Sequence, residues 1–113
     1  DVGFTDLPAD LPPPPEPDTR HARHLYTLLL DLNRINLTRD EFMNRLQAEN
    51  IGCGVHFVAL HLQKYYRETY GFQPEDYPVS MDASRRTVSL PLSAKLTDQD
   101  ADDVVGAVRH ILI

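Results

Sequence analysis

Three short segments have the hydrophobic pattern of strands. Residues 25–30 (LYTLLL) are almost wholly apolar and rich in strand-forming side chains, so we expect a mostly buried strand there. Residues 87–90 (TVSL) form a similar run, which Pro91 ends. Residues 52–57 (GCGVHF) alternate in character, which predicts another strand with His56 on the face opposite to its neighbours.

A helix is predicted soon after the first apolar run. Thr38 and Glu41 have the spacing of a capping box, in which each side chain accepts a hydrogen bond from the backbone amide of the other residue. Phe42 and Leu46 follow at helical spacing and share one face. Because Asn50 tolerates the left-handed conformation that ends helices, we expect this helix to stop near residue 49.

The most regular helical pattern lies at the carboxyl end. Thr97 and Asp100 resemble a second capped start, with the shorter Asp in place of the usual Glu. We also expect shorter helical segments at residues 61–70 and 80–86, separated by a loop that contains two prolines. The carboxyl-terminal stripe of apolar residues at helical spacing consists of Ala101, Val104, Val105, Val108, Ile111 and Leu112.

The order of these elements predicts the architecture. Strand, helix, strand, loop, strand and helix describe a small α+β domain, with about three strands covered by two main helices. A length of 113 residues suits one domain. With 42% hydrophobic and 25% charged residues the composition is that of a globular protein, so we expect most of the chain to fold.

The amino-terminal part is rich in proline. Six of the nine prolines lie in the first 17 residues, and four of them follow one another at residues 12–15. Proline cannot donate the backbone hydrogen bond that a helix or a central strand needs. We therefore predict that residues 1–20 are an interdomain connector and that residues 21–113 are the folded domain. A frayed terminus is the alternative.

Charge and apolar length bear on location and partners. The 17 acidic and 11 basic side chains give a formal net charge of -6, and the basic residues are dispersed, which disfavours nucleic acid. The apolar runs are far shorter than the roughly 20 residues that span a bilayer, and no signal-peptide pattern opens the chain. We therefore expect a cytoplasmic protein without nucleic-acid or membrane partners.

The sequence holds no complete active site. It has no glycine-rich phosphate loop, no Ser-His-Asp order and no paired-carboxylate spacing. His56 and His61 alone do not supply the three or four ligands of a metal site, so we expect none. Cys53 is the single cysteine, and a nucleophilic role would require a neighbouring base. On a strand, His56 points to the opposite face, so we interpret Cys53 as a half-buried core residue.

Residues 52–61 are the best candidate for ligand binding. The glycines allow close approach of a ligand or another backbone, and the imidazoles of His56 and His61 can donate hydrogen bonds to a hydroxyl-rich or anionic ligand. Alternatively, each imidazole bonds a nearby carbonyl group. Tyr65 belongs to a pair of adjacent tyrosines that could stack on a sugar or base, or could anchor a surface helix to its core.

Four segments together resemble the DegT/DnrJ/EryC1/StrS aminotransferases. They are HARHLY at 21–26, GVHF at 54–57 with the residues up to His61, QKYYRE at 63–68, and VSLPL at 88–92 before an acidic capped helix. The likeness covers roughly residues 20–112. It implies the small carboxy-terminal domain of a fold-type I enzyme that depends on pyridoxal phosphate (PLP). It also implies a missing amino-terminal large domain that carries the cofactor lysine, and a homodimeric full-length protein.

The resemblance implies a function for the full-length enzyme. It would transfer an amino group from glutamate to a nucleotide-linked 4-keto-sugar of the cell envelope or lipopolysaccharide. Residues 56–68 look most like the branch that acts on UDP-4-keto-arabinose. The candidate contacts of the sugar nucleotide are then His61, His56 and Tyr65. We expect the 113 residues by themselves to bind no cofactor and to be inactive. The alternatives are a free-standing α+β binding or regulatory module and a homo-oligomeric structural protein.

Overall fold

A three-stranded antiparallel sheet forms the centre of the molecule. The computed structural model describes residues 2–113. The strands are β1 (Ala9–Asp10), β2 (Tyr26–Leu30) and β3 (Thr87–Leu90), in the order β1-β2-β3. In the central pairing Tyr26 lies opposite Leu90, and Leu28 lies opposite Val88. The strands predicted within 25–30 and at 87–90 are thus confirmed.

The strand predicted at residues 52–57 is wrong. This segment runs beside β3 but makes only one isolated bridge, in which the Gly54 amide donates to the Ser89 carbonyl at 3.0 Å and the Ser89 amide donates to the Gly54 carbonyl at 2.8 Å. Two glycines among its first three residues supply no side chains to pack against a neighbouring strand, which weakens pairing. The third strand is β1, a two-residue element that the proline-rich pattern concealed.

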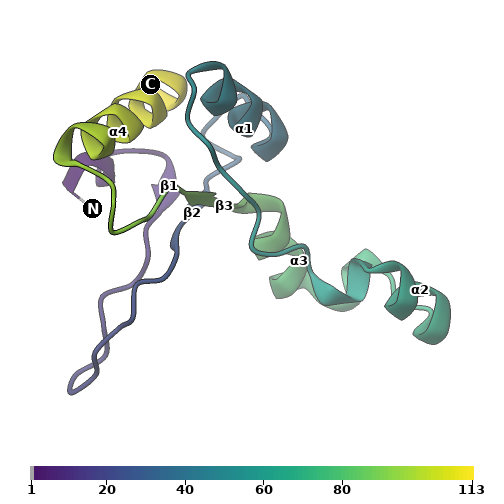
Figure 1. Cartoon of the computed structure of the whole chain (residues 1–113). Coiled ribbons are helices and arrows are strands. Elements are labelled where there is room, and N and C mark those ends of the chain that lie inside the picture. The colour runs from purple at the N-terminus through teal and green to yellow at the C-terminus, as the bar shows by residue number, and fades with distance from the viewer. Residues whose placement is uncertain (1) are drawn as a thin grey trace.

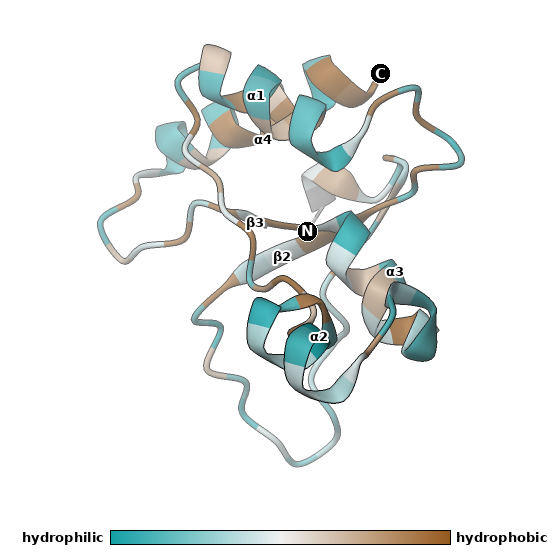
Figure 2. Cartoon of the chain, turned by 90° about the vertical axis from the view of Figure 1, so that its right-hand side faces the viewer, coloured by the Kyte–Doolittle hydropathy of each residue, from teal (hydrophilic) through white to brown (hydrophobic). Residues whose placement is uncertain are grey.

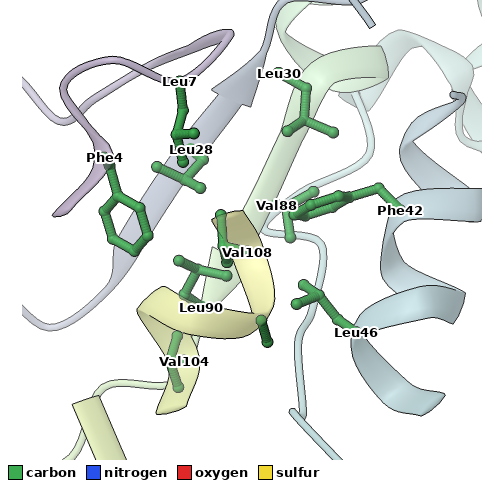
Figure 3. Close-up of a cluster of buried hydrophobic side chains, with 11 residues drawn as sticks. Phe4, Leu7, Leu28, Leu30, Phe42, Leu46, Val88, Leu90, Val104 and Val108 are labelled. Carbon is green, nitrogen blue, oxygen red and sulfur yellow. The ribbon is translucent and has the colours of Figure 1, made fainter. Parts of the chain in front are cut away.

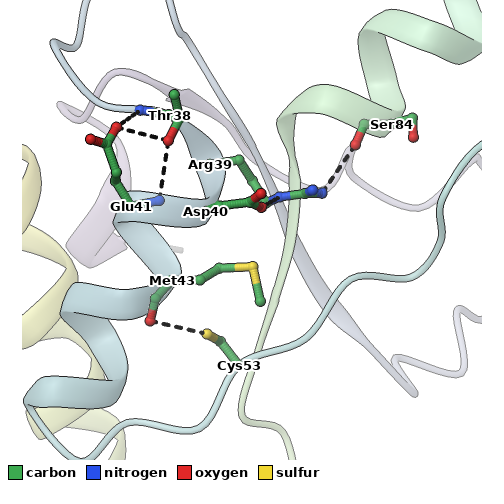
Figure 4. A network of polar contacts seen from close by, with 7 residues as sticks. All are labelled: Thr38, Arg39, Asp40, Glu41, Met43, Cys53 and Ser84. Carbon is green, nitrogen blue, oxygen red and sulfur yellow. Dashed lines mark hydrogen bonds and ion pairs between the residues drawn. The ribbon is translucent and has the colours of Figure 1, made fainter.

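Both main helices begin at the predicted capping boxes. Helix α1 (Arg39–Ala48) starts after Thr38, whose amide donates to Glu41 Oε2 at 2.7 Å while its hydroxyl accepts from the Glu41 amide at 3.2 Å (Figure 4). The hydrogen bonds that the Thr38 amide and the Thr38 hydroxyl donate to Glu41 Oε2 lower the pKa of the Glu41 carboxyl below its usual value. Asn50 has a φ of 61°, which confirms the left-handed stop. Helix α4 (Asp98–Leu112) has the same cap at Thr97.

Helices α1 and α4 lie side by side over one face of the sheet (Figure 1). Their apolar faces meet those of β2 and β3, which confirms the predicted small α+β fold with two main covering helices. Figure 3 shows Phe42 and Leu46 against Val88, and Val104 and Val108 near Leu90. The buried core consists of Phe4, Leu7, Leu28, Leu30, Phe42, Leu46, Val88, Leu90, Val104, Ala107 and Val108.

A helical arm extends away from the α1–α4 pair (Figures 1 and 2). We call residues 60–86 the arm. It contains η2 (Leu60–Leu62), α2 (Lys64–Tyr70), η3 (Pro74–Asp76) and α3 (Pro78–Arg86). The predicted helix at 80–86 is confirmed and begins two residues earlier, because Pro78 is favourable in the first turn. Across residues 2–113, the structure contains no helix with the length and apolar character needed to span a membrane.

Residues 3–10 pack onto the domain. Phe4 and Leu7 are 5% and 4% exposed, and they join the core beside Leu28 (Figure 3). Arg109 of α4 donates to both oxygens of the Asp6 carboxylate, at 2.6 and 2.8 Å, and this pairing holds the pKa of Asp6 at about 2. The predicted connector of residues 1–20 therefore includes a packed segment, and its role between two domains stays a prediction.

The remaining proline-rich residues form a long loop. Residues 11–25 join β1 to β2 without helix or strand, and they project from the sheet in Figure 1. The run of four prolines lies in this loop, as the lack of backbone donors predicts.

The packing of the first segment can be tested by replacing Phe4. We expect Phe4→Ala to lower the free energy of unfolding by about 3–5 kcal/mol, because it leaves a cavity among buried apolar side chains. Glu16→Ala, in the exposed loop, is the control and should change it by less than about 0.5 kcal/mol. Urea denaturation measures both. An equally small effect of the two substitutions would contradict the packing of this segment.

Candidate functional site

The three residues predicted to contact a ligand lie in three different environments. His56 is exposed beside β3, His61 is buried in the arm, and Tyr65 is exposed on α2. His56 borders one concavity and His61 borders another. The structure therefore does not bring the two histidines into one shared hollow.

Ser89 of β3 holds His56 in place. Its hydroxyl lies 2.8 Å from His56 Nδ1, and Ser89 itself is only 3% exposed. The bridge between Ser89 and Gly54 fixes the backbone two residues before the imidazole. A Cβ at Gly54 would lie 3.1 Å from His56 Cε1, so the glycine lets the ring approach closely. With Nδ1 engaged, Nε2 is the nitrogen that remains for a ligand.

The concavity beside His56 is lined by two histidines. It has a volume of about 360 Å³ and lies between the end of the proline-rich loop, the segment of Gly52–Gly54 and β3. His24, the last histidine before β2, is its second imidazole. We did not single out His24 as a ligand contact from the sequence. The only signal was its place in the HARH motif at 21–24.

His61 is a packed residue of the arm. It is 5% exposed, its Nε2 lies 3.2 Å from the Pro74 carbonyl oxygen, and its ring centre lies 5.0 Å from that of Tyr77. A carbonyl oxygen only accepts, so Nε2 carries the proton in this contact. The alternative that an imidazole bonds a nearby carbonyl thus describes His61. It ties η2 to η3 and borders a concavity of about 240 Å³.

A chain of aromatic rings runs along the arm. Tyr65 is 63% exposed, and its ring meets Tyr66 and Tyr70 edge to face at 5.4 and 6.3 Å between ring centres. Tyr70 stacks on Phe72 at 5.5 Å, and Phe72 meets Tyr77 at 5.2 Å. Tyr66, Phe72 and Tyr77 border the His61 concavity. Tyr65 is therefore an exposed ring at one end of this chain.

Cys53 is a half-buried thiol, as predicted. Its Sγ lies 3.8 Å from the Met43 carbonyl oxygen of α1 (Figure 4), and burial raises its pKa, so it is no activated thiolate. The predicted separation of Cys53 from His56 by strand geometry is wrong, because residues 52–57 are not a strand and both residues border one concavity. Within residues 2–113, no group of three metal-ligating side chains is placed to hold a metal ion.

Two sequence comparisons show which known proteins this chain is similar to. Residues 1–109 match the sequence model described as the DegT/DnrJ/EryC1/StrS aminotransferase family. The chain is 41% identical over 112 residues to the spore coat polysaccharide biosynthesis protein SpsC of Bacillus subtilis, covering 98% of this chain and 29% of that protein.

Solved structures show the same fold. DesV of S. venezuelae, in complex with a ketimine intermediate, superimposes with a TM-score of 0.81 at 30% identity, covering 96% of this chain and 28% of that one. The putative sugar aminotransferase Spr1654 of Streptococcus pneumoniae, in its PMP form, gives 0.84 at 24% identity, covering 98% and 27%. The chain thus spans less than a third of the length of each of these relatives.

Proposed function

Because the chain belongs to the DegT/DnrJ/EryC1/StrS aminotransferase family, we propose that it is the small carboxy-terminal domain of a sugar aminotransferase. One observation carries this proposal. The family model and the solved structures match almost the whole of this chain, yet this chain covers less than a third of the length of those proteins. A free-standing binding or regulatory module is disfavoured, since the relatives contain this domain within a much longer chain.

The cofactor of such an enzyme, PLP, does not fit the residues of this chain alone. PLP supplies the carbanion-stabilising chemistry of amino transfer and is held through a lysine. The chain has two lysines, Lys64 and Lys95, and both side chains are exposed. Lys64 extends toward Glu68 at 3.9 Å rather than into an apolar pocket. The cofactor lysine therefore belongs to a large domain outside these residues.

The contribution of this domain is recognition and closure over the substrate. His56 offers Nε2 at an open concavity, and the contact with Ser89 limits the rotation of its ring. His61 acts by holding the arm in shape through Pro74, and Tyr65 offers an exposed ring to a sugar or base. We propose His56 and Tyr65 as substrate contacts of the full-length enzyme, and His61, which borders a concavity of the arm, as the residue that positions the arm against the substrate.

The finer identity of the reaction follows from the resemblance of the motifs. The acceptor is a nucleotide-linked 4-keto-sugar and the donor is glutamate, in a homodimeric and cytoplasmic enzyme of cell-envelope or lipopolysaccharide sugar biosynthesis. The UDP-4-keto-arabinose branch rests on residues 56–68 alone, and the relatives described above do not bear on it. SpsC is a polysaccharide biosynthesis protein by its name, in keeping with a sugar substrate.

The proposal is tested by comparing the full-length protein with residues 1–113. We expect the full-length protein to bind PLP and to form glutamate-dependent amino-sugar product from a nucleotide-linked 4-keto-sugar. Residues 1–113 should do neither, because both lysines are exposed. Product formation by liquid chromatography and cofactor absorbance measure the two properties. Turnover by residues 1–113, or a full-length protein that does not bind PLP, would overturn the proposal.

A second test concerns His61. In the full-length enzyme, His61→Ala should raise KM or lower kcat for the keto-sugar by about tenfold, because the arm loses the contact with Pro74. Bound PLP should stay unchanged. His110→Ala is the matched control, since that imidazole is exposed and contacts Glu49 on the opposite side of the domain core. Steady-state kinetics with both variants decide the point, and unchanged constants for His61→Ala would remove it from the site.

A further inference from the structure

The concavity of His24 and His56 has the chemistry of an anion site. We propose that it binds the phosphate groups of the nucleotide-linked substrate, with His24 as a contact that completes it. This inference rests on the proposed function, since it assigns one part of that substrate to one part of the domain. Two segments far apart in the sequence supply the imidazoles, namely the end of the proline-rich loop and the stretch before the arm.

The orientation of His56 supports this inference. Ser89 is buried and its backbone is paired with Gly54, so its hydroxyl is a fixed partner for His56 Nδ1. When the hydroxyl donates to Nδ1, Nε2 carries the proton and becomes a hydrogen-bond donor. When the imidazole is protonated, Nε2 is again a donor and carries charge. In these two states an oxygen of an anion is a suitable partner for Nε2, and a bound anion selects them over the tautomer in which Nδ1 donates to Ser89 and Nε2 only accepts.

The charge of the lining points the same way. The chain has 17 Asp and Glu residues against 11 Lys and Arg, yet among residues 2–113 no carboxylate lines this concavity. The loop that ends at His24 also carries Arg20, His21 and Arg23. The described lining of this hollow in an acidic protein thus consists of neutral residues and two histidines, a surrounding that favours negative charge.

The shape of the lining favours phosphate over sugar or base. Besides the histidines, the concavity is bordered by aliphatic residues such as Leu25 and Leu92, and no Phe, Tyr or Trp ring on which a base or sugar could stack belongs to its lining among residues 2–113. The ring of Phe57 meets that of His56 edge to face at 5.0 Å but is not part of the lining, and the other aromatic rings of this region gather around His61. Its volume of about 360 Å³ lies at the lower end of the ~300–1,000 Å³ typical of ligand sites.

The experiment uses the PLP-saturated full-length enzyme and inorganic pyrophosphate as the probe, measured by isothermal titration calorimetry. We expect His24→Ala and His56→Ala each to weaken pyrophosphate binding about tenfold or more, the effect of losing one charge-assisted hydrogen bond. His24→Glu should abolish it, because a carboxylate then faces the anion. His110→Ala is the control of equal chemistry outside the concavity and should bind like the wild type.

The outcomes separate this inference from the proposed function. His24 is exposed at the end of an irregular loop, so its variants keep the fold and decide the matter even if His56→Ala unfolds. Equal pyrophosphate affinity in the wild type and both His24 variants overturns the inference, as does a wild type that does not bind pyrophosphate. Either result leaves the proposed function intact if the enzyme still aminates a keto-sugar. Loss of pyrophosphate binding in the variants of an enzyme that aminates no sugar supports the site and refutes the function.

Discussion

The pairing of β2 with β3 is the interaction on which the rest of the structure depends. Leu28 and Val88 face each other across this ladder, and with Leu90 they form the floor on which α1 and α4 pack. Ser89 lies between Val88 and Leu90 in β3, so its side chain faces the other side of the sheet. There it reaches His56. The same four-residue strand thus fixes both the core and the candidate site.

The elements predicted correctly are those whose signals are local. The apolar runs of β2 and β3 and the capping boxes at Thr38 and Thr97 are set by neighbouring residues, so the sequence alone identifies them. β1 has two residues, and only its pairing with β2 makes it a strand. The strand predicted at residues 52–57 is wrong because an alternating pattern does not ensure a pairing partner along the whole segment, and only Gly54 pairs with β3.

The candidate site could be predicted only in part. Residue type and motif order identified His56 and His61, but their separation into two concavities depends on the path of the chain after Gly54. The predicted separation of Cys53 from His56 onto opposite faces is wrong because it assumed a strand at residues 52–57. His24 escaped notice because nothing in a single sequence indicates that the end of the proline-rich loop meets residues 52–56. Contacts of this kind are set by tertiary structure rather than by local spacing.

The measurement that tests the central claim most directly is the tautomeric state of His56 in protein labelled with nitrogen-15 at histidine. If Ser89 couples the sheet to the site, the wild type and Ser89→Thr, which keeps the hydroxyl, should show one dominant state of the His56 ring by long-range proton–nitrogen spectra. Ser89→Ala should show a mixture of tautomers with averaged nitrogen shifts. Spectra of Ser89→Ala that equal those of the wild type would contradict the account.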